Sequence, residues 1–306
     1  MEEFRYGEAI GYGSGKVILL GEHAVVHGSP AIALGLDRGV QLRMHPTSSN
    51  SGKTINPQDQ LGQALRVALE LSGADAMLDP RLEISTDLPV AMGFGSSAAL
   101  AVALVEACSA GLGAALSAEK RIAHANEIEK IFHGRPSGID AATATVGGVL
   151  RFQSGPPLAY STIPLARDLR LALVETGTQH TTSSTVGSVS ENAAEFPEIY
   201  SNLFTSISGL VVAADGYLRA GDYRSLGTAM TVNHGLLRTL GVSTPELDDA
   251  VATALREGAL GAKLTGAGGG GAILALLDRN TEGFLERMRQ HGLRTTLTEV
   301  AANRSE

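Results

Sequence analysis

A glycine-rich segment of the chain has the residue types and the spacing that could hold an anion. Gly93-Phe94-Gly95-Ser96-Ser97-Ala98 follows a predicted strand and leads directly into an apolar predicted helix. Glycine permits positive φ angles and lets backbone N–H groups come close to a ligand. The free N–H groups and the dipole of a helix N-terminus favour phosphate, and the hydroxyls of Ser96 and Ser97 can reach a phosphate oxygen or a magnesium ion. The segment predicts a phosphate-binding loop, and it is also formally a G-x-G-x-x-A dinucleotide fingerprint.

Two other segments are rich in glycine. Gly266-Ala267-Gly268-Gly269-Gly270-Gly271 lies between two predicted strands, and Gly11-Tyr12-Gly13-Ser14-Gly15-Lys16 precedes the first one. The latter is not a P-loop, because that motif needs glycine at position 10 and Ser or Thr after the lysine, where this chain has Ile10 and Val17. Each segment alone is also compatible with a tight turn, so the ligand-binding interpretation depends on polar residues elsewhere.

Three charged residues supply the rest of the chemistry. Lys16 opens an apolar predicted strand, Glu129 lies in a predicted helix with several apolar positions, and Asp140 lies in the first turn of a short predicted helix. A lysine, two carboxylates and glycine-lined backbone donors suit phosphoryl transfer, which needs positioning and neutralisation of charge on the phosphate oxygens. Each residue also has a purely structural interpretation: a lysine at a strand edge, a solvated glutamate, and an aspartate that complements a helix dipole.

Composition and charge exclude several classes of protein. The 306 residues are 43% hydrophobic and 18% charged, with a net charge of −8 and no block of Lys or Arg. These values exclude a disordered chain and argue against nucleic acid or an anionic membrane as partner. Cys108 is the only cysteine, which fits a reducing compartment, and no spacing typical of a zinc site occurs. The acidic start, Met1 to Phe4, and the lack of an apolar run of about 20 residues predict a cytoplasmic protein without a membrane span.

Strands and helices must position these residues, and they are mixed without strict β-α-β alternation, which predicts the α+β class. The expected strands are 16–20, 39–45, 82–86, 149–153, 169–175, 262–265, 272–277 and 293–300. The expected helices are 60–71, 98–112, 118–132, 139–145, 197–219, 222–240, 245–257 and 280–291, with Ser117 and Thr244 as N-caps. The length suggests two domains, which we place at 1–165 and 166–306.

Four segments taken together resemble the motifs of the GHMP kinases, and most closely those of the mevalonate kinase family within them. In the family's order they are Ser14–Gly28, Pro89–Ala99, His133–Asp140 and Lys263–Gly271. The resemblance implies a ribosomal S5 domain 2-like N-terminal domain and a ferredoxin-like C-terminal domain, with the active site between them. It also implies ATP and Mg²⁺ as cofactors and transfer of the γ-phosphoryl group to the C5 hydroxyl of (R)-mevalonate.

The resemblance implies a role for each matched residue. Asp140 would take or orient the hydroxyl proton, and Lys16 would stabilise the developing alkoxide and keep Asp140 ionised. The magnesium ligands would be Ser97 and Glu129. The nucleotide would be bound by Gly93, Gly95, Ser96, Ser97, Ala98, Gly266, Gly268 and Gly269, and mevalonate by Glu22, His23, Thr181 and Thr182. A homodimer is the family's expectation.

Departures from the family pattern keep other functions open. Ala91, Met92 and Phe94 intervene in the phosphate loop, and Arg135 replaces a commonly uncharged residue near the substrate. A GHMP kinase for phosphomevalonate, homoserine or a sugar is therefore the first alternative. An NAD-dependent oxidoreductase using 93–98 is the second, although the acidic residue at about the right offset, Glu119, begins a helix. A catalytically inactive GHMP sensor is disfavoured because the two carboxylates and the lysine named above are retained.

Overall fold

The computed structural model describes residues 8–46, 51–74, 79–88, 93–134, 136–153, 159–177 and 182–302, with the side chains of 182–186 left out. The chain forms two compact units. The first holds residues up to Lys16 with Arg38–Val90 and Gly95–Gly147, and the second holds Val17–Asp37, Ala91–Phe94 and the chain from Gly148 onward. Strands β1 (Ala9–Leu20) and β2 (Pro30–His45) run from one unit into the other. The domain boundary near residue 165 stays a prediction.

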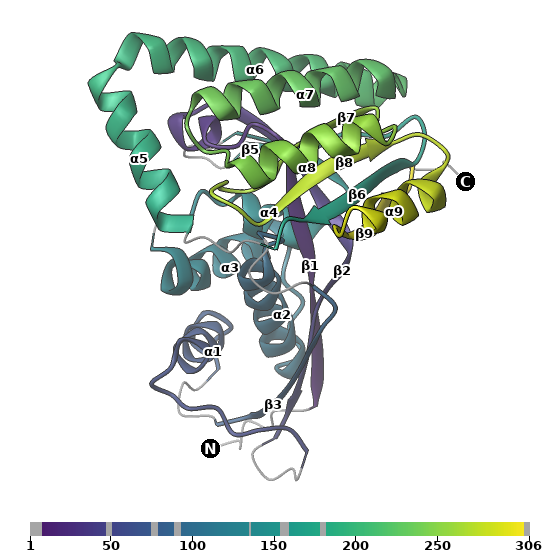
Figure 1. Ribbon diagram of the computed structural model, residues 1–306. Coiled ribbons are helices and arrows are strands. Elements are labelled where there is room, and N and C mark those ends of the chain that lie inside the picture. The colour runs from purple at the N-terminus through teal and green to yellow at the C-terminus, as the bar shows by residue number, and fades with distance from the viewer. Residues whose placement is uncertain are drawn as a thin grey trace, which may run out of the picture. The chain divides into compact units, whose positions relative to one another are not determined.

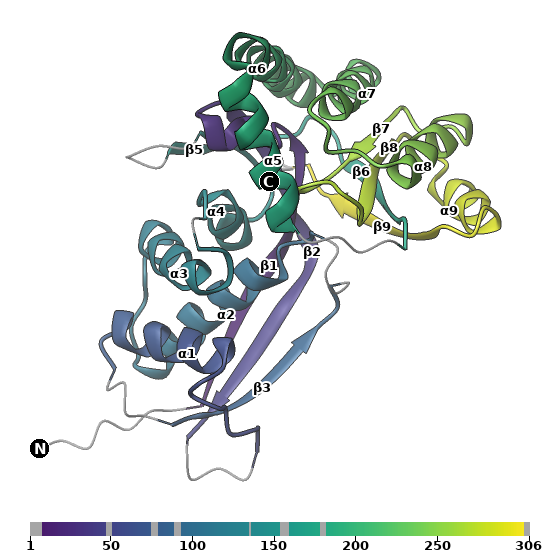
Figure 2. The same ribbon diagram turned by 60° about the vertical axis from the view of Figure 1, so that its left-hand side comes forward.

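In the first unit, helices lie along one side of a β-structure (Figures 1 and 2). Strand β3 (Arg81–Thr86) pairs antiparallel with β2 from Val40↔Thr86 to His45↔Arg81. The helices are α1 (Gln60–Leu71), α2 (Ser96–Gly111), α3 (Ala118–His133) and α4 (Ile139–Val146). Helix α2 touches the other three helices, which explains why its sequence is apolar on all sides.

The glycines at positions 11 and 13 are packing residues of this unit. A Cβ atom added at Gly13 would lie 2.0 Å from the carbonyl oxygen of Ala99, and one added at Gly11 would lie 1.9 Å from that of Ala103. Both carbonyls belong to α2, so strand β1 can approach this helix only where it carries no side chain. The glycine-rich segment 11–16, which does not match a P-loop, is therefore part of a strand packed on a helix.

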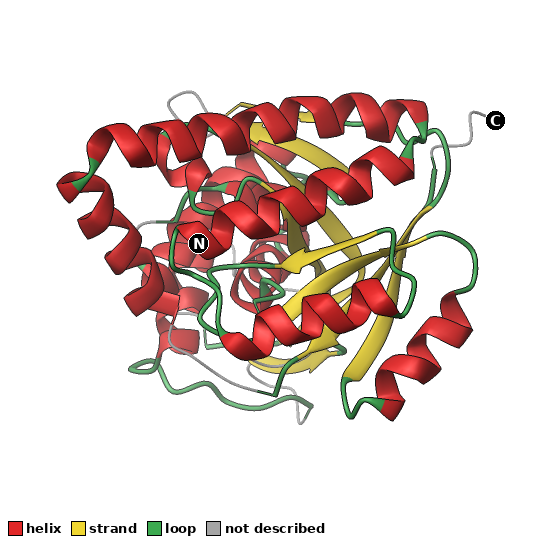
Figure 3. Cartoon of the chain, turned by 45° about the horizontal axis from the view of Figure 1, so that its top comes forward, coloured by secondary structure: helices red, strands yellow, loops and turns green. Residues whose placement is uncertain are grey.

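The second unit contains a four-stranded antiparallel sheet in the order β7-β8-β6-β9. Its strands are β6 (Leu169–Glu175), β7 (Gly261–Leu264), β8 (Ala272–Leu277) and β9 (Arg294–Val300). Helices α7 (Tyr223–Thr239), α8 (Pro245–Arg256) and α9 (Thr281–Gln290) pack on this sheet, and α6 (Pro197–Ala220) lies beside α7 (Figure 3). The core between them is aliphatic, with Phe204, Phe284 and Tyr200 as its aromatic members.

The second unit also contains two short strands and two further helical segments among its described residues. Strand β4 (Val149–Gln153) pairs antiparallel with the start of β2, and β5 (Ala159–Thr162) pairs with β4. A short 3₁₀ helix, η1 (Ala24–His27), follows β1, and helix α5 (Thr182–Glu195) precedes α6. No helix in the described part of the chain has the length and apolarity to cross a membrane.

The predicted α+β class is confirmed, and most predicted elements are found close to their expected bounds. The side chain of Ser117 accepts a hydrogen bond from the N–H of Lys120, and that of Thr244 accepts one from Leu247, so both predicted N-caps are confirmed. The differences are that β1 begins seven residues before Lys16, at Ala9, that β2 begins nine residues before the expected start at Gly39, at Pro30, and that η1, β5 and α5 were not expected.

We predict that two glycines of the same helix respond in opposite ways to alanine. A Cβ at Gly227 of α7 would lie 2.3 Å from the carbonyl oxygen of Leu260, whereas one at Gly235 would meet nothing within 4 Å. Gly227→Ala should therefore lower the free energy of unfolding by about 1–3 kcal/mol through overpacking. Gly235→Ala should raise it by about 0.5–1 kcal/mol, because alanine loses less backbone entropy in a helix. Urea unfolding measures both, and equal effects would show that α7 does not lie on β7 as described.

Candidate active site

Lys16 and Asp140 form an ion pair in the first unit, with 3.0 Å between Nζ and Oδ1. The lysine side chain is 7% exposed and the aspartate 29%. Asp140 is held in the first turn of α4, which begins after Gly138 in a left-handed conformation. Lys16 ends the part of β1 that belongs to this unit. A buried ammonium group is stable only beside an acceptor, so the two residues fix one another.

Glu129 is buried near this pair, and one of its carboxylate oxygens has no hydrogen-bond partner in the described structure. It is 1% exposed, and its Oε1 atom has no hydrogen-bond partner in the described structure. Burial, and next the charge of Asp140, raise the pKa of Glu129 to about 7, while the Ser97 hydroxyl and the charge of Lys16 act in the opposite direction. Buried polar atoms normally find partners. With two carboxyl groups near one lysine and one carboxylate oxygen unpartnered, the group has the charge and the acceptor to bind a further cation.

Helix α2 presents its N-terminus in the same unit. Its first backbone hydrogen bond is donated by the N–H of Ala99 to the carbonyl of Gly95, so the N–H groups of Ser96, Ser97 and Ala98 have no partner within the helix. Gly95 has φ +70°, and a Cβ there would lie 2.6 Å from Cγ of Lys16. Gly95 therefore starts the helix and also leaves space for the lysine stem.

His133 joins this group, although no role was predicted for it. Its Nε2 atom lies 2.9 Å from the hydroxyl oxygen of Ser97. His133 is the last residue of α3, one turn after Glu129, so one helix brings both side chains toward the start of α2. The only available signal was its place at the head of the segment that leads to Asp140.

Glu22 lies in the second unit, where both oxygens of its buried carboxylate have partners. Its Oε1 atom accepts a hydrogen bond from Nζ of Lys263, and its Oε2 atom accepts one from Asn233 at 3.3 Å. Glu22 is 1% exposed, and the other two residues are 0% exposed. Burial raises the pKa of Glu22 and lowers that of Lys263, and the charge of each partner opposes the effect on the other.

His23 is the one non-glycine residue in the described chain with a positive φ angle, +60°. Its Nε2 atom lies 3.0 Å from the carbonyl oxygen of Ala267, so this nitrogen carries the proton and donates. Burial, the largest cause, lowers the pKa of His23 to about 4. The imidazole is therefore neutral at neutral pH.

The run Gly266–Gly271 is close to Gly93 in the second unit. A Cβ on Gly266 would lie 3.9 Å from Cα of Gly93, so these two backbones are near neighbours. Gly268 packs on the carbonyl of Val242, where a Cβ would come within 2.1 Å of the oxygen, and the N–H of Gly269 donates to the same carbonyl at 2.8 Å. The run is thus anchored at Gly268 and Gly269, while Gly266 lies next to Gly93.

Other predicted residues lie outside this description. Thr181 is not among the described residues, and Thr182 is the first residue of α5 with its side chain undescribed. Pro89–Met92 and Arg135 are likewise outside. Among the described residues, no cluster of three or more His, Cys, Asp or Glu side chains makes a complete metal site.

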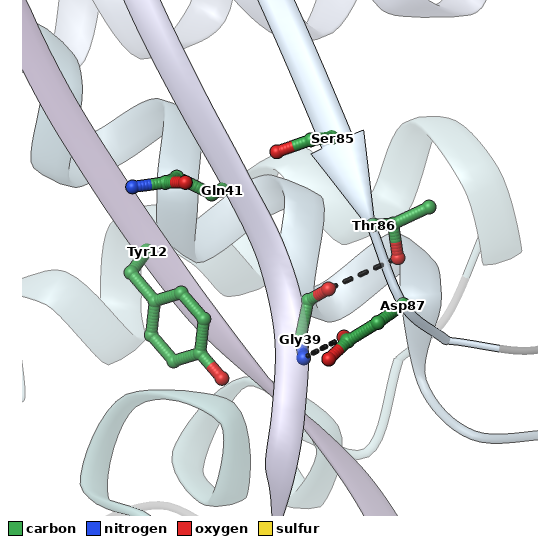
Figure 4. Close-up of a pocket in the computed structure, with 6 residues that line it drawn as sticks. All are labelled: Tyr12, Gly39, Gln41, Ser85, Thr86 and Asp87. Atoms are coloured by element: carbon green, nitrogen blue, oxygen red, sulfur yellow. Dashed lines mark hydrogen bonds between the residues drawn. The ribbon is translucent and has the colours of Figure 1, made fainter.

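A cavity in the first unit contains none of the predicted site residues. It is lined by Tyr12, Gly39, Gln41, Ser85, Thr86 and Asp87 (Figure 4). Asp87 accepts a hydrogen bond from the N–H of Gly39 at 2.8 Å, and the hydroxyl of Thr86 donates to the Gly39 carbonyl at 3.0 Å. These bonds tie the end of β3 to β2, so the polar groups have a structural use.

The comparisons with known proteins agree with one another. Two family models match, the GHMP kinases N terminal domain at residues 61–148 and the GHMP kinases C terminal model at 216–293. The mevalonate kinase of Thermococcus sibiricus is 34% identical over 292 residues, covering 85% of this chain and 86% of that protein. The structure of L. major mevalonate kinase in complex with R-mevalonate matches at a TM-score of 0.87 and 28% identity, over 100% of both chains. That of the Methanococcus jannaschii mevalonate kinase matches at 0.82 and 26%, over 98% of this chain and 100% of the other. With relatives of this similarity along nearly its whole length, the chain belongs to the GHMP kinases, in the mevalonate kinase family.

Proposed function

We propose that the chain is an ATP-dependent kinase that phosphorylates the C5 hydroxyl of (R)-mevalonate to give 5-phosphomevalonate, a step of isoprenoid biosynthesis. The observation that carries the proposal is the Lys16–Asp140 pair, at 3.0 Å, beside a buried Glu129 with a free oxygen. Relatives named mevalonate kinase, one of them solved with R-mevalonate, support this substrate.

In this proposal Asp140 accepts or orients the proton of the substrate hydroxyl. Its carboxylate is partly exposed, so a hydroxyl can approach the oxygen that Lys16 leaves free. The ammonium group of Lys16 stabilises the alkoxide as the proton leaves. A positioned base of this kind contributes about 10²–10⁴-fold to the rate, and the lysine adds electrostatic stabilisation where charge develops.

We assign Mg²⁺ binding to Glu129 and Ser97. The donor set suits this ion, because Mg²⁺ is usually bound through one or two carboxylates together with substrate phosphates. The unpartnered Oε1 of Glu129 would supply the carboxylate oxygen, and the Ser97 hydroxyl would supply a neutral one. When bound, Mg²⁺ would neutralise charge on the phosphate oxygens.

We assign nucleotide binding mainly to backbone groups. The N–H groups of Ser96, Ser97 and Ala98, with Gly93, Gly95 and the glycine run, would bind the phosphates of ATP. In this proposal residues 1–165 form the ATP-binding domain, and residues 166–306 form a second domain. The net charge of −8 and the single cysteine support a cytoplasmic protein that binds no nucleic acid, and a homodimer follows from the resemblance alone.

A substrate panel tests the proposed alcohol. In a coupled assay of ADP release with Mg·ATP, mevalonate should give turnover well above that with phosphomevalonate, homoserine or galactose. Equal or faster turnover with any of these three would replace mevalonate as the substrate, and NAD reduction without ADP release would replace the kinase assignment altogether.

Asp140→Asn tests the base. The amide keeps the size of the side chain but cannot take a proton, so kcat should fall by about 10²–10⁴-fold while ATP binding, measured by calorimetry, stays nearly unchanged. The matched control is Asp249→Asn, an exposed aspartate of α8, which should leave kcat as in the wild type. Near-normal turnover by the Asp140 variant would remove its assignment as base.

Glu129→Gln tests the metal assignment. The variant removes one carboxylate oxygen, so the Mg²⁺ concentration for half-maximal activity should rise by at least about tenfold. Binding of Mn²⁺ in the presence of ADP, followed by electron paramagnetic resonance, should weaken in parallel. Glu127→Gln changes an exposed glutamate of the same helix, paired with Lys130 at 2.7 Å, and should change neither value. Unaltered Mn²⁺ binding by the Glu129 variant would contradict the assignment.

A further inference from the structure

We propose that His23 is a positioning residue for the glycine run Gly266–Gly271, so that it acts on nucleotide binding and not on contact with the alcohol substrate. The inference rests on the proposed ATP-dependent function, and it differs from the substrate-side role that the resemblance implies for this residue. It is built from contacts inside the second unit.

The segment that leads into the glycine run is fixed at every second residue to the end of β1 and the turn after it. Lys263 binds Glu22, the hydroxyl of Thr265 donates to the carbonyl of Ile18 at 3.1 Å, and the carbonyl of Ala267 accepts from His23 at 3.0 Å. Gly261–Leu264 is strand β7 and the chain turns at Gly266 and Ala267, so the three contacts follow the segment from the strand into the turn. This segment is therefore attached to residues 18–23 at three points, and His23 makes the attachment that lies within the run, at its second residue.

The backbone of His23 shows that this attachment is imposed by its surroundings. A φ angle of +60° is uncommon for a residue with a side chain, and such conformations cost about 1–3 kcal/mol unless the surrounding structure holds them. The side chain is buried, and the charged or titratable groups that act on it are His27 and Lys263. The imidazole therefore stays neutral, with its proton on the nitrogen that faces Ala267.

A fixed carbonyl at Ala267 determines the direction of the next N–H group. The peptide unit is planar, so the carbonyl of Ala267 and the N–H of Gly268 point in opposite directions and turn together. The glycines in this run have positive φ angles and no side chains to hold them. The run's other anchors are the carbonyl of Val242, which accepts from Gly269, and Thr176, whose N–H donates to Gly271. Without His23 the first half of the run would lose its only side-chain hydrogen bond among the described contacts.

Two variants separate hydrogen bonding from shape. His23→Leu keeps the approximate volume but removes the donor, and His23→Gln keeps an amide donor at a similar reach. His23→Leu should raise the KM for ATP and the Kd for the nucleotide alone by up to about tenfold, the value of one hydrogen bond, with the KM for mevalonate almost unchanged. His23→Gln should recover most of the loss. His27→Leu, in the same turn but stacked on Phe204, should leave the nucleotide Kd unchanged.

Calorimetric titration with ADP, which needs no second substrate, supplies the Kd, and circular dichroism confirms folding. If His23→Leu does not fold, Thr265→Val removes the neighbouring attachment to Ile18 and should also weaken ADP binding, by a few-fold. A rise in the KM for mevalonate with unchanged ADP binding would overturn the proposal in favour of substrate contact. Unchanged values for both ligands would overturn it as well. Failure of mevalonate as substrate would instead show as wild-type protein that binds ADP without turnover.

Discussion

The cost of burying charge governs both groups of polar residues in this protein. A buried charge must be paired or must coordinate a cation. In the second unit the requirement is met within the chain, because Glu22 has both Lys263 and Asn233 and no oxygen left over. In the first unit it is not met, because Lys16 is paired with Asp140 and the buried Glu129 has an Oε1 atom without a partner in the described structure. The proposed metal site is therefore placed at the carboxylate with the spare oxygen, whereas the Glu22 carboxylate has a partner at each oxygen and ties distant parts of the chain together.

Glycine has two separate uses in the chain, and the count of 37 glycines does not distinguish between them. At Gly13 and Gly227 the missing side chain lets a strand and a helix approach, as the clashes of an added Cβ show. At Gly95 and Gly266 a positive φ angle is also required, +70° and +77°, and the backbone stays available to a ligand. Composition predicts an excess of turns or binding loops, and only the neighbours of each glycine show which use applies.

Much of the fold could be predicted from local patterns. Helix α1 and strand β6 have the expected bounds, because a clear apolar face in one and a continuous apolar run in the other leave little choice. The first half of β1 was missed because its glycines interrupt the alternation that marks a strand. Strand β5 is four residues long and largely exposed, and α5 begins in a Ser/Thr-rich run of low helix propensity. In these elements tertiary packing outweighs the local signal.

The candidate site was less predictable, because its pairs join residues far apart in sequence. Glu22 and Lys263 are 241 residues apart, and nothing local to either indicates the other. The neighbours Lys16 and Asp140 could be anticipated only through the family resemblance. The hydrogen bond between Ser97 and His133 had only a weak signal, the place of His133 at the head of the segment that leads to Asp140. His23 was predicted to be a site residue from the resemblance, but its positive φ angle has no signature in the sequence.

The segment Gly93–Ala98 shows how context changes the meaning of a motif. A dinucleotide fingerprint needs a parallel β-α-β unit, in which its glycines admit a pyrophosphate between strand and helix. Here the preceding strand, β3, pairs antiparallel with β2, which is not that arrangement. The space that Gly95 leaves is next to the stem of Lys16, so the glycine admits the lysine side chain to the start of α2. The same spacing of glycines thus favours a site for phosphoryl transfer, since what approaches the backbone is a lysine paired with a carboxylate.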